Sequence, residues 1–174
     1  MENNFVERKV LIRQMQVGDW VRVRSIYVEG LATGDATFET EAPSWKTWDE
    51  GHLSVPRLVA VSETDGTVLG WAALSRVSPR AVYAGVGEVS VYVAANSRSL
   101  GIGQDLLEQL VVQSEHNGIW TLQASVFPEN KASLAVHKIC GFREVGIRQK
   151  IGRMNGIWRD TVLLERRSAL VGSD

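Results

Sequence analysis

Residues 88–107 read EVSVYVAANSRSLGIGQDLL, and this stretch decides how the chain is expected to fold. The β-branched and aromatic run from Val89 to Val93 predicts a buried strand. Polar residues follow it, and the glycines Gly101 and Gly103 then open an amphipathic helix. A strand, a glycine turn and a helix start together present unpaired backbone N–H groups, which suit an anion such as a phosphate. Glycine permits that approach because it has no Cβ.

Two well-known phosphate-binding loops are excluded by the residues present. The P-loop needs GxxxxGK followed by Ser or Thr, and the sequence contains no such run. The dinucleotide fingerprint GxGxxG needs a third glycine at position 106, where Leu106 stands. The loop instead reads R-x-x-G-x-G from Arg98 to Gly103, with the carboxylate of Glu88 at the start of the preceding strand. Taken alone, this short pattern also fits an ordinary strand-to-helix turn.

A downstream segment supports the functional interpretation. Residues 119–126 alternate apolar and polar side chains, as a strand does, and residues 130–142 then read NKASLAVHKICGF. Loop and segment together resemble the GCN5-related N-acetyltransferases (GNAT), whose R-x-x-G-x-G loop binds the pyrophosphate of acetyl-CoA. In that superfamily the second segment supplies an Asn that contacts the coenzyme and a Tyr that protonates the leaving thiolate. This chain has Asn130 and, at the Tyr position, His137.

Other segments resemble one group within the superfamily. They are TFET (37–40), RAVY (80–83), SVYV (90–93) and GIWRD (156–160). Over roughly residues 10–167 the chain looks like the phosphinothricin and methionine sulfoximine N-acetyltransferases. The run AGVG (84–87) is smaller than the Trp-containing run of well-known members, so a different pocket volume is expected.

The resemblance implies that acetyl-CoA is the co-substrate and that no metal is needed. Main-chain groups of the strand would pair with the pantetheine arm, and amides of the loop would hold the pyrophosphate. The residues assigned to acetyl-CoA in this way are Val91, Tyr92, Val93, Ser99, Leu100, Gly101, Ile102, Gly103, Gln104 and Asn130.

Glu88 is the candidate general base, because the acceptor amine must lose a proton before it takes the acetyl group. A carboxylate is a much weaker base than an amine. Partial burial beneath residues 84–87, or relay of the proton through a water, is expected to close that gap. The alternative is that Glu88 only binds the substrate ammonium or pairs with a neighbouring arginine.

His137 is the second candidate catalytic residue. It stands seven residues after Asn130, on nearly the same helix face, and could reach the coenzyme sulfur. Neutral His could act as a base, and protonated His could donate to the thiolate. A packing role is the alternative. The other two histidines, His52 and His116, lie in polar stretches and are expected to be solvated.

The candidate substrate-binding residues follow from the chemistry of an amino-acid-like acceptor, which needs a guanidinium for its carboxylate. Arg76 and Arg80 flank the segment that leads to Glu88, and Tyr83 lies between Arg80 and Glu88. Phe38 offers an apolar wall. Each arginine could equally be a surface charge.

The resemblance also implies a homodimer, and six Trp residues leave aromatic surface for an interface. Trp158 and Asp160 could complete the pocket, from the same chain or from the partner subunit. Packing is the default interpretation for each Trp.

Composition suits one globular domain over residues 1–174, with a core at about 10–167. Nineteen basic and twenty acidic side chains nearly cancel, and no basic patch predicts a nucleic-acid partner. The sequence contains no run of about 18 apolar residues, so no membrane span is predicted. The N-terminus shows no hydrophobic export segment. The single Cys140 fits a reducing cytoplasm, and packing is favoured over a nucleophilic role.

The expected fold is of the α/β (α+β) class, with a mixed, mainly antiparallel sheet flanked by helices, as in the GNAT acyl-CoA N-acyltransferase fold. Expected strands are 10–15, 58–63, 67–76, 86–93, 119–126, 142–152 and 157–166, and expected helices are about 18–31, 45–53, 101–117 and 130–139.

The expected function is acetyl-CoA-dependent N-acetylation of a small amino-acid-like amine such as phosphinothricin or methionine sulfoximine. Two alternatives are acetylation of another amino acid or a protein N-terminus, and a non-catalytic acetyl-CoA-binding sensor. A protein substrate would need an open acidic groove, whereas a free amino acid needs a closed pocket with an arginine. The TFET and RAVY segments favour a free amino acid as the acceptor. The presence of Glu88, Asn130 and His137 together disfavours the sensor.

Overall fold

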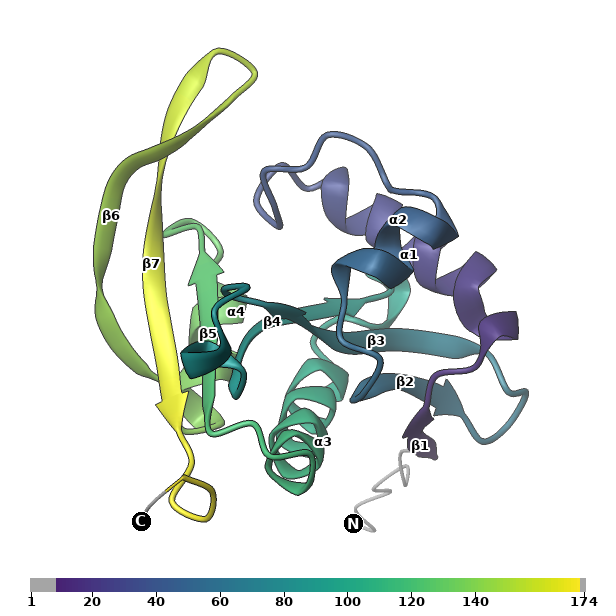
Figure 1. Cartoon of the computed structure of the whole chain (residues 1–174). Coiled ribbons are helices and arrows are strands. Elements are labelled where there is room, and N and C mark those ends of the chain that lie inside the picture. Colours follow the sequence, from purple (N-terminus) through teal and green to yellow (C-terminus); the bar gives the residue numbers. More distant parts are fainter. Residues whose placement is uncertain (1–8, 173–174) are drawn as a thin grey trace, which may run out of the picture.

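The computed structural model describes residues 9–172 (Figure 1). Its strands are β1 (Val10–Gln14), β2 (Arg57–Ser62), β3 (Val68–Arg76), β4 (Val86–Val93), β5 (Thr121–Val126), β6 (Arg143–Met154) and β7 (Ile157–Arg167). They form one sheet in the order β1-β2-β3-β4-β5-β7-β6. Only the β4–β5 pair in this sheet is parallel, so the expected mixed, mainly antiparallel sheet is confirmed.

The helices are α1 (Trp20–Leu31), α2 (Trp45–Gly51), α3 (Ile102–His116) and α4 (Lys131–Ile139). They agree with the expected helices to within a few residues. Three short 3₁₀ turns were not expected: η1 (Val17–Asp19), η2 (Ala81–Tyr83) and η3 (Ala95–Ser97). Such turns are too short to show helical periodicity in the sequence.

The helices cover both faces of the sheet. In Figure 1, α1 and α2 lie above β3 and β4, and α3 lies below them. Alternation along β4 divides its side chains between the two layers. Val89, Val91 and Val93 pack with α3, whereas Tyr92 packs with the α1–α2 layer. The buried Leu side chains of α3 each contribute about 1.5–3 kcal/mol to this core.

Strands β4 and β5 separate halfway along their length. Their ladder holds only three residue pairs and ends at Glu88 opposite Gln123. Beyond that point β4 continues along β3 as far as Val93, and β5 continues along β7 as far as Val126. In this sheet the facing edges of β4 and β5 therefore present backbone groups that no strand pairs.

The β6–β7 hairpin extends beyond the rest of the sheet, toward the level of the loop between α1 and α2 (Figure 1). Its register shifts between Arg148 and Gly152. No helix in residues 9–172 has the length and apolar character to cross a membrane. Residues 1–8 and 173–174, including most of the N-terminal stretch considered for export, lie outside the described residues.

Candidate active site

The loop between β4 and α3 places free amides at a helix start. Gly101 is the N-cap of α3 at φ +79°, a left-handed conformation that favours glycine. The helical ladder starts with the Asp105 N–H, which donates to the Gly101 carbonyl at 3.1 Å. The amides of residues 102–104 therefore have no partner within the helix. Arg98 anchors the loop by donating to the carbonyls of Val93 (3.3 Å) and Glu29 (3.2 Å).

Gly103, unlike Gly101, does not have a backbone conformation that requires glycine. Its φ lies outside the left-handed region, and an added Cβ would lie 3.5 Å from Val93 Cγ2, an ordinary contact. Neither backbone conformation nor the packing of the protein therefore requires glycine there. What the missing side chain provides is access to the main chain at the first turn of α3.

Glu88 lies where β4 and β5 begin to separate. Its carboxylate is half-buried, and Oε2 accepts a hydrogen bond from Gln123 Nε2 at 2.7 Å. One of the small residues before it, Gly85, leaves no open space. The Trp120 ring covers Gly85 so closely that an added Cβ would lie 2.0 Å from it. The space freed at Gly85 is thus filled from within the protein.

His137 is buried in the packing of α4, with 5% of its surface exposed. Its Nδ1–H donates to the Ser133 carbonyl at 2.7 Å, and its ring meets Phe142 edge-on. The other nitrogen, Nε2, is then the unprotonated one, and it is buried without a partner. Burial lowers the pKa of His137. The site therefore favours neutral imidazole, and a proton acceptor or packing role over donation to a thiolate.

Asn130 caps α4 and also ties it to the loop after α1. Its Oδ1 accepts from the Ser133 N–H and its Nδ2 donates to the Asp35 carbonyl, both at 3.1 Å. Its amide thus makes two contacts within the protein at the start of α4.

A cavity of about 240 Å³ lies on the sheet face covered by α1 and α2. Its lining residues are Tyr27, Thr37, Glu39, Glu41, Pro43, Thr47, Trp48, His52, Trp71, Ser90 and Tyr92. Ser90 and Tyr92 follow Glu88 at alternate positions of β4, so the cavity and the carboxylate share one face. Trp71 and Tyr92 stack with ring centroids 4.8 Å apart.

The charged side chains that line this cavity are acidic. Glu39 and Glu41 belong to the lining, and no Arg or Lys does. Burial raises the pKa of Tyr27 and Tyr92, so both phenols are neutral. The cavity therefore combines aromatic walls with negative charge.

His52 corrects an expectation, because it is half-buried. It stacks on Trp48 at 4.3 Å, its Nδ1–H donates to the Trp48 carbonyl at 2.7 Å, and its ring lines the cavity. Burial lowers its pKa. The polar residues beside it in sequence had predicted an exposed position instead. His116 is exposed, as expected.

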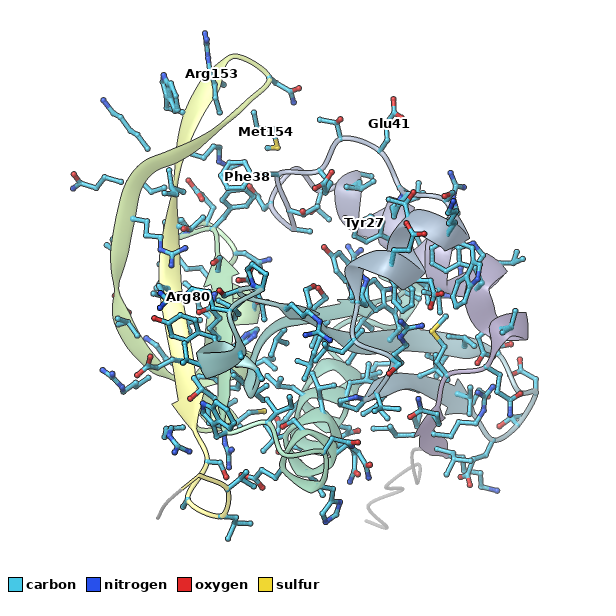
Figure 2. All side chains as sticks on the ribbon, in the orientation of Figure 1. Tyr27, Phe38, Glu41, Arg80, Arg153 and Met154 are labelled. Carbon is cyan, nitrogen blue, oxygen red and sulfur yellow. The ribbon has the colours of Figure 1, made fainter. Side chains whose placement is uncertain are left out.

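The structure does not bring the candidate substrate arginines to this cavity. Arg76 is exposed and lines a separate, more open cavity of about 370 Å³. Arg80 is exposed too, with its guanidinium 5.6 Å from the centroid of the Tyr83 ring. Figure 2 shows Arg80 lying away from Tyr27 and Glu41.

Phe38 forms a wall on the hairpin side of the α1–α2 loop (Figure 2). Its ring meets Phe127 edge-on at 4.8 Å and lies against Gly152 of β6, where a Cβ would come within 2.6 Å of it. The loop residue thus contacts the end of β5 and the β6–β7 hairpin together.

Trp158 and Asp160 do not line the cavity within one chain. Asp160 Oδ1 accepts from the Lys150 N–H at 2.7 Å and so supports the irregular part of the hairpin. Trp158 is exposed, with Arg153 over its ring at 5.9 Å. Cys140 is a packing residue, as expected, because burial raises the pKa of its thiol to about 11 and leaves little nucleophilic thiolate.

Sequence reasoning missed several residues of the site. Trp48 and Trp71 are buried core residues, so the packing interpretation is confirmed, but their rings also line the cavity. Gln123 was visible only as one polar position in an alternating strand, yet it holds Glu88. Alternation shows which face a residue occupies, but not the pairing that places two strands together.

Comparison with known proteins identifies similar chains. The sequence profile of the acetyltransferase (GNAT) family matches residues 20–142. The phosphinothricin N-acetyltransferase of Alcaligenes faecalis is 36% identical over 165 residues, which are 89% of this chain and 81% of that protein. An L-methionine sulfoximine/L-methionine sulfone acetyltransferase of Pseudomonas paraeruginosa is 28% identical, over 88% and 92% of the two chains.

A solved structure is similar along almost the whole chain. A phosphinothricin acetyltransferase from Sinorhizobium meliloti, in complex with acetyl-CoA, superposes with a TM-score of 0.84 and 28% identity. The match covers 95% of this chain and 92% of that one.

Proposed function

The chain belongs to the acetyltransferase (GNAT) family, and we propose that it acetylates the α-amine of a small amino-acid-like acceptor. It is an acetyl-CoA-dependent N-acetyltransferase. The observation that carries the proposal is the separation of β4 from β5 at Glu88, on a strand that also lines the aromatic cavity and leads to the 99–104 loop.

The residues around that separation fit acetyl-CoA. The amides of residues 99–104 would hold its diphosphate at the start of α3, where the helix dipole also favours negative charge. The absence of a side chain at Gly103 supports this assignment, because the protein itself does not require it. The open edge of β4 at residues 91–93 would pair with the amide groups of the pantetheine arm. When bound, the coenzyme supplies the activated acetyl group.

Glu88 would remove the proton of the acceptor amine, directly or through a water. The Gln123 amide donates to its carboxylate and so fixes the orientation of the carboxyl group. A backbone N–H on the open edge of β4 would stabilise the negative charge that develops on the thioester oxygen. His137 Nε2, unprotonated and without a partner, is suited to accept a hydrogen bond rather than to give one.

The acidic cavity favours an acceptor whose side chain carries no negative charge. The cavity would take the side chain of the acceptor, and the loop that carries Phe38 lines it through Thr37 and Glu39. Arg80 and Arg76, which do not line the cavity, are the candidates for binding the acceptor's carboxylate. Glu39 and Glu41 would oppose the anionic phosphinate of phosphinothricin. We therefore place uncharged side chains, such as those of methionine sulfoximine and methionine sulfone, above phosphinothricin.

Release of free thiol from acetyl-CoA, measured with a panel of amino acids, tests this function. We expect turnover with methionine sulfoximine and a lower kcat/KM with phosphinothricin. Absence of turnover with every α-amine, despite tight acetyl-CoA binding, would support the sensor alternative. A protein N-terminal peptide in the same panel separates the remaining alternative.

The chain is further proposed to act as a cytoplasmic homodimer of one-domain subunits. A single sheet spanning Val10 to Arg167 supports the one-domain assignment. The β6–β7 hairpin supports the dimer, because it exposes several apolar side chains. These are Val145, Ile147, Ile151, Ile157 and Trp158. The single cysteine and the balanced charge are compatible with the cytoplasm.

A further inference from the structure

Arg159 is the residue of the GIWRD segment to which the function above assigns no role. It lies on β7 opposite Gly152 of β6, near the turn that joins the two strands. Although its side chain is charged, only 14% of it is exposed. A guanidinium buried to this degree needs partners for its N–H groups.

Those partners come from two segments that are far apart in sequence. Arg159 Nη1 donates to the Gly34 carbonyl at 2.8 Å. Its Nη2 donates to Asp35 Oδ1 at 2.8 Å and to Glu129 Oε2 at 3.1 Å. Its guanidinium also lies 3.9 Å from the centroid of the Phe127 ring. One side chain thus joins the loop after α1 to the loop between β5 and α4.

Neighbouring contacts extend the same junction. Asn130, next to Glu129, donates to the Asp35 carbonyl at 3.1 Å. Phe38, three residues after Asp35, meets the Phe127 ring that Arg159 covers. The α1–α2 loop, whose residues Thr37 and Glu39 line the cavity, and the cap of α4 are therefore joined by one small cluster.

We propose that Arg159 is a positioning residue for the acceptor, which holds the α1–α2 loop, and with it Phe38, against the fixed frame of β5, α4 and β7. The inference rests on the proposed function, since it takes this loop as part of the acceptor site. In this role Arg159 contacts neither the acceptor nor the coenzyme. It affects acceptor binding indirectly, by fixing the position of the loop.

The chemistry of arginine suits this task better than that of lysine. A planar guanidinium can serve three acceptors in one plane and stack on an aromatic ring at the same time. The hydrogen bond to Asp35 raises the pKa of Arg159, so the group stays charged. A lysine would keep the charge but not the planar arrangement of several N–H donors. It should therefore hold the loop only in part.

Steady-state kinetics of four variants tests the proposal. Arg159→Gln should raise the acceptor KM about tenfold or more, and change kcat by less than about threefold, because the loop is displaced while the reacting groups remain. Arg159→Lys should give an intermediate KM. Asp35→Asn should raise KM as well, and the double variant should exceed the larger single effect only slightly. Arg143→Gln is the control, because it removes an ion pair with Glu165 on the same two strands.

Two further measurements distinguish positioning from stability. Hydrogen exchange of residues 33–44 should become faster in Arg159→Gln, while the acetyl-CoA Kd from calorimetry stays within about twofold. An acceptor KM equal to that of the wild type in Arg159→Gln and Asp35→Asn overturns the inference, whatever happens to the melting temperature. If Arg159→Gln does not fold, Arg159→Lys and Asp35→Asn decide the outcome by the same criterion. The proposed function fails separately, by absence of wild-type turnover, and Arg159 then loses this role with it.

Discussion

Glu88 and Gln123 form the contact on which the proposed chemistry depends. The 2.7 Å hydrogen bond joins the last paired residues of β4 and β5, so the carboxylate is held where the strands separate. His137 lies on the neighbouring helix, with a buried unprotonated nitrogen. Glu88 on β4 and His137 on α4 are thus the two candidate proton acceptors of the proposed site.

Replacing Glu88 with Gln should lower kcat/KM by about 10²–10⁴-fold, because the proton acceptor is lost while the shape remains. Glu165→Gln, which removes a carboxylate of strand β7 beside β5, is the control and should keep most of the activity. A kcat/KM of Glu88→Gln close to that of the wild type would remove Glu88 from the role of base.

His137 should make the protein less stable in mild acid. Burial lowers its pKa in the folded state below the ordinary 6.5, so between these two values the unfolded chain binds more protons. The free energy of unfolding should therefore fall as pH drops below about 6.5. In His137→Phe this loss should be smaller, though not absent, because burial lowers the pKa of His52 too. Urea unfolding between pH 5 and 7.5 measures both slopes, and equal slopes would contradict the assignment.

At the scale of elements, the loop that begins α3 separates two reasons for a glycine. Gly101 is required by its left-handed backbone, whereas Gly103 is required by neither conformation nor packing. The two positions therefore offer a matched pair of substitutions two residues apart.

Gly101→Ala should destabilise the fold by about 1–2 kcal/mol, the usual cost of a left-handed conformation with a Cβ. Gly103→Ala should leave stability unchanged or slightly higher, and yet weaken acetyl-CoA binding about tenfold or more, because the Cβ blocks the main chain. Denaturant unfolding and calorimetry on both variants provide the data. Normal acetyl-CoA affinity in Gly103→Ala would be incompatible with a diphosphate on these amides.

Sequence patterns predicted the elements well and the contacts between them poorly. The β-branched run of β4 and the Leu spacing of α3 identified a strand and a helix within a residue or two. The burial of His52 depends on stacking with Trp48 across a helix end, which no periodicity encodes. The proposed role of Arg159 depends on three acceptors brought together by distant segments. The GIWRD pattern therefore singled out the segment but could not predict these contacts.

At the scale of the whole molecule, the β6–β7 hairpin is the largest departure from a covered sheet. Strand β6 is the edge of the sheet, and most of its residues are exposed. Ile147 is 58% exposed and Ile157 65% exposed. Apolar residues at an open edge favour association with another chain.

Replacing Ile147 with Lys should therefore shift the protein toward a monomer, because a charge would have to be buried in the proposed interface. Sedimentation velocity over a range of concentrations gives the measurement. Arg148→Gln, at the adjacent exposed position, is the control. A wild-type protein that sediments as a monomer at all concentrations would contradict the homodimer.

A crystal structure with bound acetyl-CoA tests the central claim most directly. The account predicts diphosphate oxygens within hydrogen-bond distance of the amides of residues 99–104, and the pantetheine arm along the open edge of β4, with the thioester toward Glu88. Coenzyme bound away from the gap between β4 and β5, for instance in the aromatic cavity beneath α1 and α2, would contradict it.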